Sequence, residues 1–420
     1  MVVKIMGLEM RPSNIVTVLD IGSTKVCCCI ANTFDDGRFK IIGVGYCVCH
    51  GVRSGVIIDM PSVEKSIARA VERAEKMANQ RIQSVYVSIS GKNIESEIIN
   101  ISMKAGGRII RDEDILKFFN YCHSVTEDRI AIHSIPILYS VDSLQGIKNP
   151  VGMVANNLSV NMNLVTVPKT QLDNLLMCLA RCHLDSAGIV ASIYASGLSV
   201  MDEDDLQNGK IVIDFGGETT SIGFFYNGIF SGMNVISLGG RNITDDIAYG
   251  FNISTVNAEK LKTLHGSAFV SIHDENNVVF IPVVEDDSVI NLQKISKNSL
   301  NQIIQPRIEE ILNLVKKQIG KSSFTDDFSR DVTITGGGSM LTGIKDFAQG
   351  IINKKIKIKK IEDNTDGIDI QISNDFSVAI GMIKFFQLGN NDPIKTNDSV
   401  KKSKNESFLK KTIAWIENNL

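Results

Sequence analysis

Two short segments of the sequence carry residues that can bind a phosphate together with a metal ion. Residues 18–26 read VLDIGSTKV and residues 212–220 read VIDFGGETT, so in each an apolar run ends in an aspartate and continues into glycine and small polar residues. Glycine lets the backbone approach an anion closely, and such a turn presents N–H and hydroxyl donors. Asp20 and Asp214 suit Mg2+, which dehydrates reluctantly and is reached through its bound water. The repeat predicts two lobes that hold the phosphates of one nucleotide from opposite sides.

Two further observations limit the type of nucleotide-binding site. Neither repeat contains the GxxxxGK[ST] pattern, so a P-loop is excluded. Gly336, Gly337 and Gly338 follow a β-branched stretch. Three consecutive glycines cost chain entropy, so packing alone explains them poorly. We therefore expect the backbone here to lie against a flat ligand, with a purely structural turn as the alternative.

The composition is that of a globular protein with several domains. A chain of 420 residues has room for about two to four domains, and 43% apolar and 22% charged residues are ordinary values. The net charge of -3 and the pI near 6.1 argue against a dedicated nucleic-acid binder. Residues 1–14 lack the apolar run of a signal peptide, and no stretch approaches the ~20 apolar residues of a spanning helix. We expect a cytoplasmic protein.

The cysteines and histidines do not form the spacings of a metal site. The eight cysteines include Cys27, Cys28 and Cys29 in a strand-like stretch, and no CxxC pair is present. The six histidines lack HExxH or another paired ligand spacing. We predict that the cysteines are small core residues in a reducing compartment, and that the protein has no zinc site.

The first half of the chain alternates strand and helix patterns. We expect a β-hairpin over residues 15–30, a strand over 39–49 and a helix that begins at Met60 with Pro61 and continues to about Ile82. Strand-like segments at 94–103, 130–139 and 158–165 then surround a helix near 112–123. This change of character predicts a subdomain inserted into the first lobe.

The second half repeats that plan. We expect a helix at 172–182, a strand and then a helix over 188–201, strands over 211–222 and 223–231, and a helix at 242–250 after the turn at Gly239 and Gly240. A long helix at 299–319 contains Pro306, which predicts a kink or two abutting helices. A strand that begins at 332 leads through the three glycines into a helix, and a helix at 377–386 ends the folded part.

These elements predict an α/β protein with two lobes, each carrying an inserted subdomain. Lobe 1 comprises residues 1–91 and 164–206, and its insert, called insert 1, comprises 92–163. Lobe 2 comprises 207–240 and 330–386, and insert 2 comprises 241–329. Residues 387–406 are polar and lysine-containing, which is typical of a flexible linker.

The last segment, residues 407–420, has the pattern of an amphipathic helix. On a helical projection its apolar side chains fall within an arc of roughly 160°; they are Phe408, Leu409, Ile413, Trp415, Ile416 and Leu420. Lysines beside an apolar stripe with tryptophan favour a helix that lies in the membrane interface. The alternative is a terminal helix docked on the body or on a partner protein. One such tail binds reversibly, and a polymer with many tails binds far better, so the tail also suggests self-assembly.

The chain resembles the FtsA family of bacterial cell-division proteins, within the actin, sugar-kinase and heat-shock chaperone ATPase superfamily. The resemblance covers residues 15–386 and the tail. It depends on LDIGSTKV at 19–26, GIKNPVG at 146–152, SLGGRNITDDIA at 237–248, Pro306-Arg307 and TGGG at 335–338. It implies an actin-like two-lobed fold with bound ATP and Mg2+. It further implies an adaptor that polymerises on the cytoplasmic face of the inner membrane, anchors FtsZ filaments and recruits later division proteins.

The resemblance also implies roles for individual residues. The phosphate ligands would be Gly22, Ser23, Thr24 and Lys25 in the first turn and Gly216, Gly217, Glu218 and Thr219 in the second. The residues near the ribose or adenine would be Gly239, Gly240, Glu259, Lys262, Gly336, Gly337 and Met340. The acidic FtsZ C-terminal tail would meet Lys294, Lys297 and Arg307, although charged residues are usually a solvated face.

One position departs from the superfamily pattern for ATP hydrolysis. Hydrolysis needs a side chain near the γ-phosphate that positions the attacking water. Relatives are expected to carry a glutamate just before residues 195–197, and Ser192 occupies that place here. A hydroxyl is no base at neutral pH, so we predict tight ATP binding with very slow or absent turnover.

Three other functions remain as alternatives. A small-molecule kinase would need a carboxylate base in the cleft, and we can nominate none. An actin-like scaffold of the rod-shape or pilus-assembly type would share the nucleotide site, but residues 146–152 and the tail argue against it. A chaperone ATPase would carry a substrate-binding domain after residue 386, where only a short segment follows.

Overall fold

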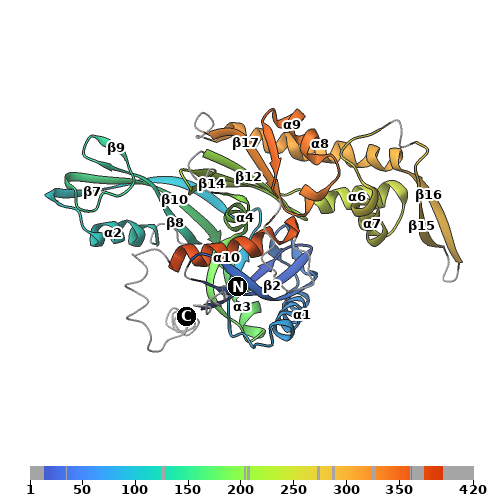
Figure 1. The fold of residues 1–420 in the computed structure, drawn as a ribbon, viewed down its shortest axis with the longest axis horizontal. Coiled ribbons are helices and arrows are strands. Elements are labelled where there is room, and N and C mark those ends of the chain that lie inside the picture. The colour runs from blue at the N-terminus through green and yellow to red at the C-terminus, as the bar shows by residue number, and fades with distance from the viewer. Residues whose placement is uncertain are drawn as a thin grey trace, which may run out of the picture.

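A computed structural model describes most of the chain. It covers residues 14–34, 36–123, 128–202, 205, 209–271, 275–285, 289–322, 328–359, 361 and 373–390. The predicted tail helix at 407–420, with its apolar residues, and most of the predicted linker lie outside these residues. Figure 1 shows two central lobes, with insert 1 extending at one end and insert 2 at the other.

Lobe 1 is built on a mixed sheet with the order β11-β6-β1-β2-β3. Strands β1 (Asn14–Ile21) and β2 (Lys25–Thr33) form the predicted hairpin, β3 (Phe39–Val48) continues it, and β6 (Ser84–Ile89) and β11 (Asp185–Ala191) add parallel strands. Two short strands, β4 (Val52–Arg53) and β5 (Val56–Ile57), lead into α1. This arrangement places the first predicted phosphate turn between β1 and β2.

The two faces of this sheet pack on different helices. Cys28 faces α1 (Met60–Ala78) and α3 (Lys169–Arg181), whereas Cys27 and Cys29 face α10 (Ser377–Asn390). Successive strand side chains alternate between faces, so three adjacent cysteines fill two cores. The prediction that these cysteines are core residues is confirmed, since all three are fully buried.

Helix α1 is shorter than predicted. Asp59 caps its N-terminus, where the side chain accepts a hydrogen bond from the Ser62 N–H, and Pro61 lies in the first turn. The helix ends at Ala78, not near Ile82, because Asn79 adopts the left-handed conformation (φ 49°) that closes a helix C-terminus.

Insert 1 is a four-stranded sheet covered by one helix. Strands β7 (Glu95–Ile109), β10 (Val154–Pro168), β8 (Arg129–Val141) and β9 (Leu144–Ile147) pair in that order, and the sheet and α2 (Asp112–His123) share one core. The three predicted strands and the helix are confirmed. The short strand β9 was not predicted.

The base of insert 1 is hydrogen-bonded to both lobes. The Asn163 amide donates to the Phe230 carbonyl (3.0 Å), and Ser96 Oγ accepts from the Met233 N–H (3.2 Å), both in strand β14 (Ile229–Ile236) of lobe 2. On the other side, His133 Nε2 accepts from the Ala191 N–H at the end of β11 (3.0 Å). The insert therefore contacts the junction between the lobes.

Lobe 2 repeats the mixed sheet, with the order β14-β13-β12-β17-β18. Its strands are β12 (Gly209–Phe215), β13 (Thr220–Tyr226), β14, β17 (Phe328–Thr335) and β18 (Lys355–Ile358), with α9 (Ile344–Ile352) against one face. The single strand expected over 211–222 is wrong. The chain turns at Gly216 and Gly217, between β12 and β13. It turns again between β13 and β14 at Asn227 and Gly228, and these two residues have positive φ.

Insert 2 comprises α6 (Gly240–Phe251), α7 (Thr255–His265) and the hairpin of β15 (Val278–Glu285) and β16 (Val289–Ser296), which was not predicted. Helix α8 (Lys297–Lys321) then returns to lobe 2 as one element. Of the two predicted outcomes at Pro306, two abutting helices are therefore excluded, and the kink stays a prediction. Ile304 and Ile308 are both fully buried, so packing holds the helix together on either side of the proline.

Two helices lie between the lobes. Helix α4 (Ser192–Val200) follows β11, and α10 packs along it. A Cβ on Gly381 would lie 1.6 Å from the Ala195 carbonyl oxygen, so only glycine permits this close crossing. Helix α10 continues past the predicted end at 386 to Asn390, and it takes in the first residues of the expected linker.

Candidate functional site

The two predicted phosphate turns lie against each other. A Cβ on Gly217 would come within 2.4 Å of Thr24 Cγ2, so the second turn contacts the first. Both turns are closed in the same way. The Gly22 N–H donates to the Lys25 carbonyl (2.9 Å), and the Gly216 N–H donates to the Thr219 carbonyl (3.0 Å). The repeated sequence thus gives a repeated backbone, one copy in each lobe.

Asp20 ends β1 beside the first turn. Its carboxylate accepts a hydrogen bond from Ser88 Oγ (2.7 Å), and Ser88 in turn accepts from the Ile21 N–H (3.1 Å). Burial raises the pKa of Asp20 above its ordinary value, although the Ser88 hydrogen bond and the charge of Lys25 oppose the shift. Ser88 was not predicted; its position at the carboxyl end of a strand parallel to β1 is the signal that could have indicated it.

Asp214 ends β12 beside the second turn. Burial and, to a smaller extent, the negative charge of Asp20 raise the pKa of Asp214 to about 7, against a lowering hydrogen bond from Ser196. Asp20 therefore lies close enough to Asp214 to disfavour the ionisation of Asp214. A divalent cation between them would remove that repulsion, so the pair fits a Mg2+ site.

Lys25 does not point into open solvent. Its Nζ donates to Asp375 Oδ2 (2.7 Å) and to the Asp375 carbonyl (2.9 Å), and it lies 3.8 Å from the centre of the Phe376 ring. Asp375 and Phe376 belong to the short 3-10 helix η4 (Asn374–Phe376) that precedes α10. Asp375 was not predicted as part of the site.

The Glu218 side chain has a partner in lobe 1 that was not predicted. Its Oε2 accepts a hydrogen bond from the Ser54 N–H of lobe 1 (2.6 Å). A carboxylate repels phosphate, so the side chain connects the lobes and leaves only the backbone of Glu218 for an anion. On the lobe 1 side, Ser23 Oγ accepts from the Gly55 N–H (3.3 Å), which fixes the same β4–β5 loop to the first turn.

The residues predicted near ribose or adenine fall into two groups. The first surrounds the start of α6. The Gly240 N–H donates to the Gly216 carbonyl (3.0 Å), and Lys262 Nζ donates to the Gly240 carbonyl (2.9 Å) and to Glu259 (2.7 Å). A Cβ on Gly239 would lie 2.6 Å from the Gly217 carbonyl oxygen, so this group is locked to the second turn. Burial lowers the pKa of Lys262.

The second group follows β17. Gly336 has a φ of 81°, and a Cβ there would lie 2.3 Å from Asp214 Oδ1. Gly336 thus lies next to Asp214, a predicted metal ligand, although it was predicted to lie near the ribose or adenine. Gly337 and Met340 delimit the 3-10 helix η3 (Gly337–Met340), and Met340 remains 60% exposed.

Ser192 is the first residue of α4 and is 9% exposed. It follows β11 directly, at the carboxyl end of the strand next to β6. Ser192 therefore lies on the element between the lobes, as expected for its place in the chain.

The residues predicted to meet an acidic peptide lie in insert 2, away from the turns. Lys294 is in β16, and Lys297 begins α8. Arg307 donates to both carboxylate oxygens of Asp246 (2.6 and 3.0 Å) and also pairs with Glu310, and these carboxylates raise its pKa further. Arg307 is therefore already occupied within the insert, while Lys294 is exposed.

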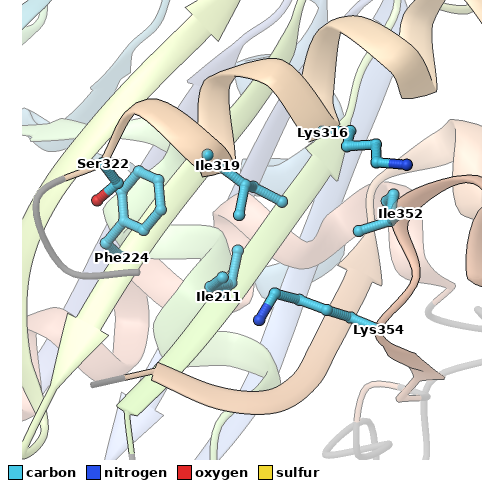
Figure 2. A pocket seen from close by; sticks show the side chains of 8 residues that line it. Ile211, Phe224, Lys316, Ile319, Ser322, Ile352 and Lys354 are labelled. Atoms are coloured by element: carbon cyan, nitrogen blue, oxygen red, sulfur yellow. The ribbon is translucent and has the colours of Figure 1, made fainter. Parts of the chain in front are cut away.

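A cavity of about 190 Å3 lies elsewhere in lobe 2, between α8, α9 and the sheet. Figure 2 shows Ile211, Phe224, Ile319 and Ile352 around it, with Lys316 and Lys354 at its sides. None of the predicted site residues lines it. Within the described ranges we find no cluster of three metal-ligating side chains, and no helix there is both long and apolar enough to cross a membrane.

Comparison with known proteins gives two family matches. Residues 211–381 match the model described as cell division protein FtsA, and residues 91–166 match the model described as an SHS2 domain inserted in FtsA. The chain is 37% identical over 363 residues to cell division protein FtsA of Agrobacterium fabrum, covering 84% of this chain and 82% of the relative. It is 30% identical over 380 residues to that of Escherichia coli K12, covering 88% and 90%.

Solved structures share the fold at low sequence identity. A PilM-PilN type IV pilus biogenesis complex matches with a TM-score of 0.62 at 13% identity, covering 89% of this chain and 98% of that chain. MreB5 of Spiroplasma citri bound to AMPPNP matches with a TM-score of 0.56 at 14% identity, covering 92% and 100%. These likenesses establish the two-lobed actin-like fold.

Proposed function

The chain belongs to the FtsA family and is an actin-like cell-division protein, and from this premise we propose that it binds ATP with Mg2+ between its lobes. The observation that carries the proposal is the contact between the two turns, with Asp20 and Asp214 in mutual electrostatic reach. The N–H groups of both turns, the Thr24 hydroxyl and Lys25 would hold the phosphates. Asp20 and Asp214 would hold the ion through its water shell. A bound nucleotide would supply the charge that joins the two lobes.

We propose the same lobe and insert boundaries as the sequence predicts. Lobe 1 (residues 1–91 and 164–206) and lobe 2 (207–240 and 330–386) would face each other across the nucleotide. The best candidates for contacts with the ribose or base are Gly239, Gly240, Glu259 and Lys262. Gly240 is hydrogen-bonded to the second turn, Gly239 packs against that turn, and Lys262 joins Gly240 to Glu259. Turnover is slow in this proposal, because Ser192 offers a buried hydroxyl where a water-positioning group is needed.

We further propose that the protein is a peripheral adaptor on the cytoplasmic face of the inner membrane at the division site. The amphipathic pattern of residues 407–420 supports anchoring to lipid. The family supports filaments of this chain, anchoring of FtsZ filaments and recruitment of later division proteins. In insert 2, Lys294 and Lys297 are better candidates for the acidic FtsZ tail than Arg307, which is engaged by Asp246.

One preparation tests both parts of the proposal. The full chain and a variant lacking residues 407–420 are titrated with ATP and Mg2+ by calorimetry, and both are then sedimented with anionic vesicles, with and without an FtsZ C-terminal peptide. Both proteins should bind ATP equally, and only the full chain should carry the peptide to the vesicles. Absence of ATP binding would overturn the nucleotide site, and unchanged vesicle binding by the shortened variant would overturn the anchor.

A further inference from the structure

The Lys25–Asp375 pair is the contact of the cleft that no sequence pattern assigns. Both ends of the pair are largely shielded from water, since the Lys25 side chain is 20% exposed and that of Asp375 is 35% exposed. Lys25 also contacts the Asp375 carbonyl and the face of the Phe376 ring. Two oxygen atoms and one aromatic ring of η4 thus hold one ammonium, which is more than a surface ion pair provides.

A second carboxylate, Asp20, lies near the Lys25–Asp375 pair. Asp375 raises the pKa of Asp20, whereas Lys25 lowers it, so all three groups are neighbours. Burial alone would raise the pKa of Asp375, but the charge and hydrogen bond of Lys25 and the hydroxyl of Ser373 outweigh burial and lower it. Asp375 is therefore an anion that depends on Lys25, at the place where the phosphates would lie.

The segment that carries Asp375 is attached to both lobes. The Asn374 amide donates to Ser339 Oγ in η3 of lobe 2 (3.1 Å). On the opposite side, the edge of the Phe376 ring meets Tyr46 of β3 in lobe 1, with ring centres 5.9 Å apart. Helix α10 begins at the next residue, Ser377. Any change at Lys25 therefore acts on a segment that joins the lobes and starts the helix between them.

We propose that Asp375 sets the nucleotide affinity of the cleft by competing with the phosphates for Lys25. This inference rests on the proposed nucleotide site. Without nucleotide, Lys25 is held by Asp375 and the bridge between the lobes is closed. A nucleoside diphosphate or triphosphate takes Lys25 by offering more negative charge than one carboxylate, and Asp375 is then released. A nucleoside without phosphate has nothing with which to compete.

The chemistry of the exchange is a change of partner, with no covalent step. The ammonium of Lys25 has three donors, two of which are used by Asp375. The apparent affinity for nucleotide is reduced by the fraction of molecules in which Lys25 is held. Replacing Asp375 by asparagine removes the competing charge and keeps the shape of the side chain.

The test is a double-mutant cycle measured by calorimetric titration with ATP and Mg2+. Asp375→Asn should bind ATP about tenfold more tightly than wild type. This factor corresponds to a Lys25–Asp375 pair that is formed in about nine-tenths of the wild-type molecules without nucleotide. Lys25→Met should bind ATP more weakly, and the double variant should match Lys25→Met, because Asp375 acts only through Lys25. Adenosine should bind wild type and Asp375→Asn equally. Asp36→Asn, which breaks an exposed pair with Arg38 in the same lobe, is the matched control.

The outcomes separate this inference from the proposed site. If wild type and Asp375→Asn bind ATP equally, or if Asp375→Asn tightens binding to the same extent without Lys25, Asp375 is not a competitor. If wild type binds no ATP, the proposed nucleotide site itself fails. Ser373→Ala keeps the charge of Asp375 and removes only a hydrogen-bond donor to it, so Asp375 should still hold Lys25 and ATP binding should not tighten. Thermal unfolding of each variant verifies that it is folded.

Discussion

The two turns have nearly the same backbone but opposite side-chain charges. Each closes with a hydrogen bond between the glycine N–H and the carbonyl three residues later, and each follows an aspartate near the end of a strand. The last position of the first turn is Lys25, which is held by Asp375 next to α10. In the second turn Glu218 reaches across to the Ser54 N–H of lobe 1. Lobe 1 therefore contributes a cation to the cleft, and lobe 2 contributes an anion that connects the lobes.

The difference shows how a repeated backbone can serve two purposes. In the proposed nucleotide site the shared glycines and N–H groups would bind the anion, because that function needs only the main chain. The side chains that differ between the turns connect the lobes. The second turn is also restrained by α6, since the Arg241 N–H donates to the Gly217 carbonyl (2.6 Å). The first turn is restrained from within lobe 1, since the Cys49 N–H donates to the Thr24 carbonyl (2.9 Å).

The largest expected effect concerns the close contact between Gly239, before α6, and the second turn. In Gly239→Ala the new Cβ would lie 2.6 and 2.7 Å from the carbonyl oxygens of Gly217 and Gly216, which cannot move away. We expect a loss of about 3 kcal/mol in the free energy of unfolding, measured with urea, and weaker ATP binding. In Gly22→Ala the nearest atom is 3.0 Å away, so the loss should be about 1 kcal/mol. Equal losses would mean that the contact of Gly239 with the second turn is no tighter than the contact within the first turn.

The second prediction concerns the pH dependence of stability. The pKa of Asp214 is about 7 in the folded protein and 3.8 in the ordinary case. Between these values the folded protein binds more protons than the unfolded chain, so its stability without nucleotide falls as the pH rises. Asp214→Asn removes this ionisation. Its thermal unfolding temperature should therefore exceed that of wild type at about pH 8, while the two converge at about pH 4.

The affinity for ATP should change with pH in the opposite direction from the stability. The carboxylate form of Asp214 is the one that suits Mg2+, so ATP affinity of the wild type should rise as the pH increases through about 7. Asp214→Asn should lose this rise. A wild-type affinity that is flat between pH 6 and 8, about one unit to either side of the pKa, would remove Asp214 from the metal site.

The smallest effects concern the hydroxyls beside the two aspartates. Ser88 donates to Asp20 and accepts from the Ile21 N–H, so Ser88→Ala leaves a buried N–H without its partner and should cost about 2 kcal/mol. Ser196 lowers the pKa of Asp214 by its hydrogen bond, and Ser196→Ala should cost about 1 kcal/mol. Urea unfolding measures both, with exposed Ser102→Ala as the control. If Ser196→Ala costs more than Ser88→Ala, the hydrogen bond beside Asp214 contributes more to stability than the hydrogen bonds beside Asp20.

The local elements were predictable because their signals are local. Apolar alternation located the β1–β2 hairpin, and Asp59 with Pro61 located the start of α1. The end of α1 was missed because Asn79, rather than glycine, supplies the left-handed residue. The hairpin of β15 and β16 was missed although β15 is an apolar run (VVFIPVVE), because Pro282 within that run argues against a strand.

The aspartates and glycines of the site were also predictable, since chemistry restricts those residue types. Their partners were not. Ser88 is 68 positions from Asp20, Ser54 is 164 positions from Glu218, and Asp375 is 350 positions from Lys25. Such pairs depend on how the lobes are placed, which no window of sequence contains. The assignment of Glu218 as a phosphate ligand illustrates this, because its charge finds a donor in the other lobe.

The hydrogen bonds at the base of insert 1 carry a consequence for removing that subdomain. Strand β14 is the outermost strand of its sheet, and insert 1 covers it through Asn163 and Ser96. A shortened chain in which a linker replaces residues 92–163 would leave the Phe230 carbonyl and the Met233 N–H open to pairing with a foreign strand. The subdomain therefore also protects lobe 2 from aggregation, and any minimal version of this protein needs a substitute cover for that edge.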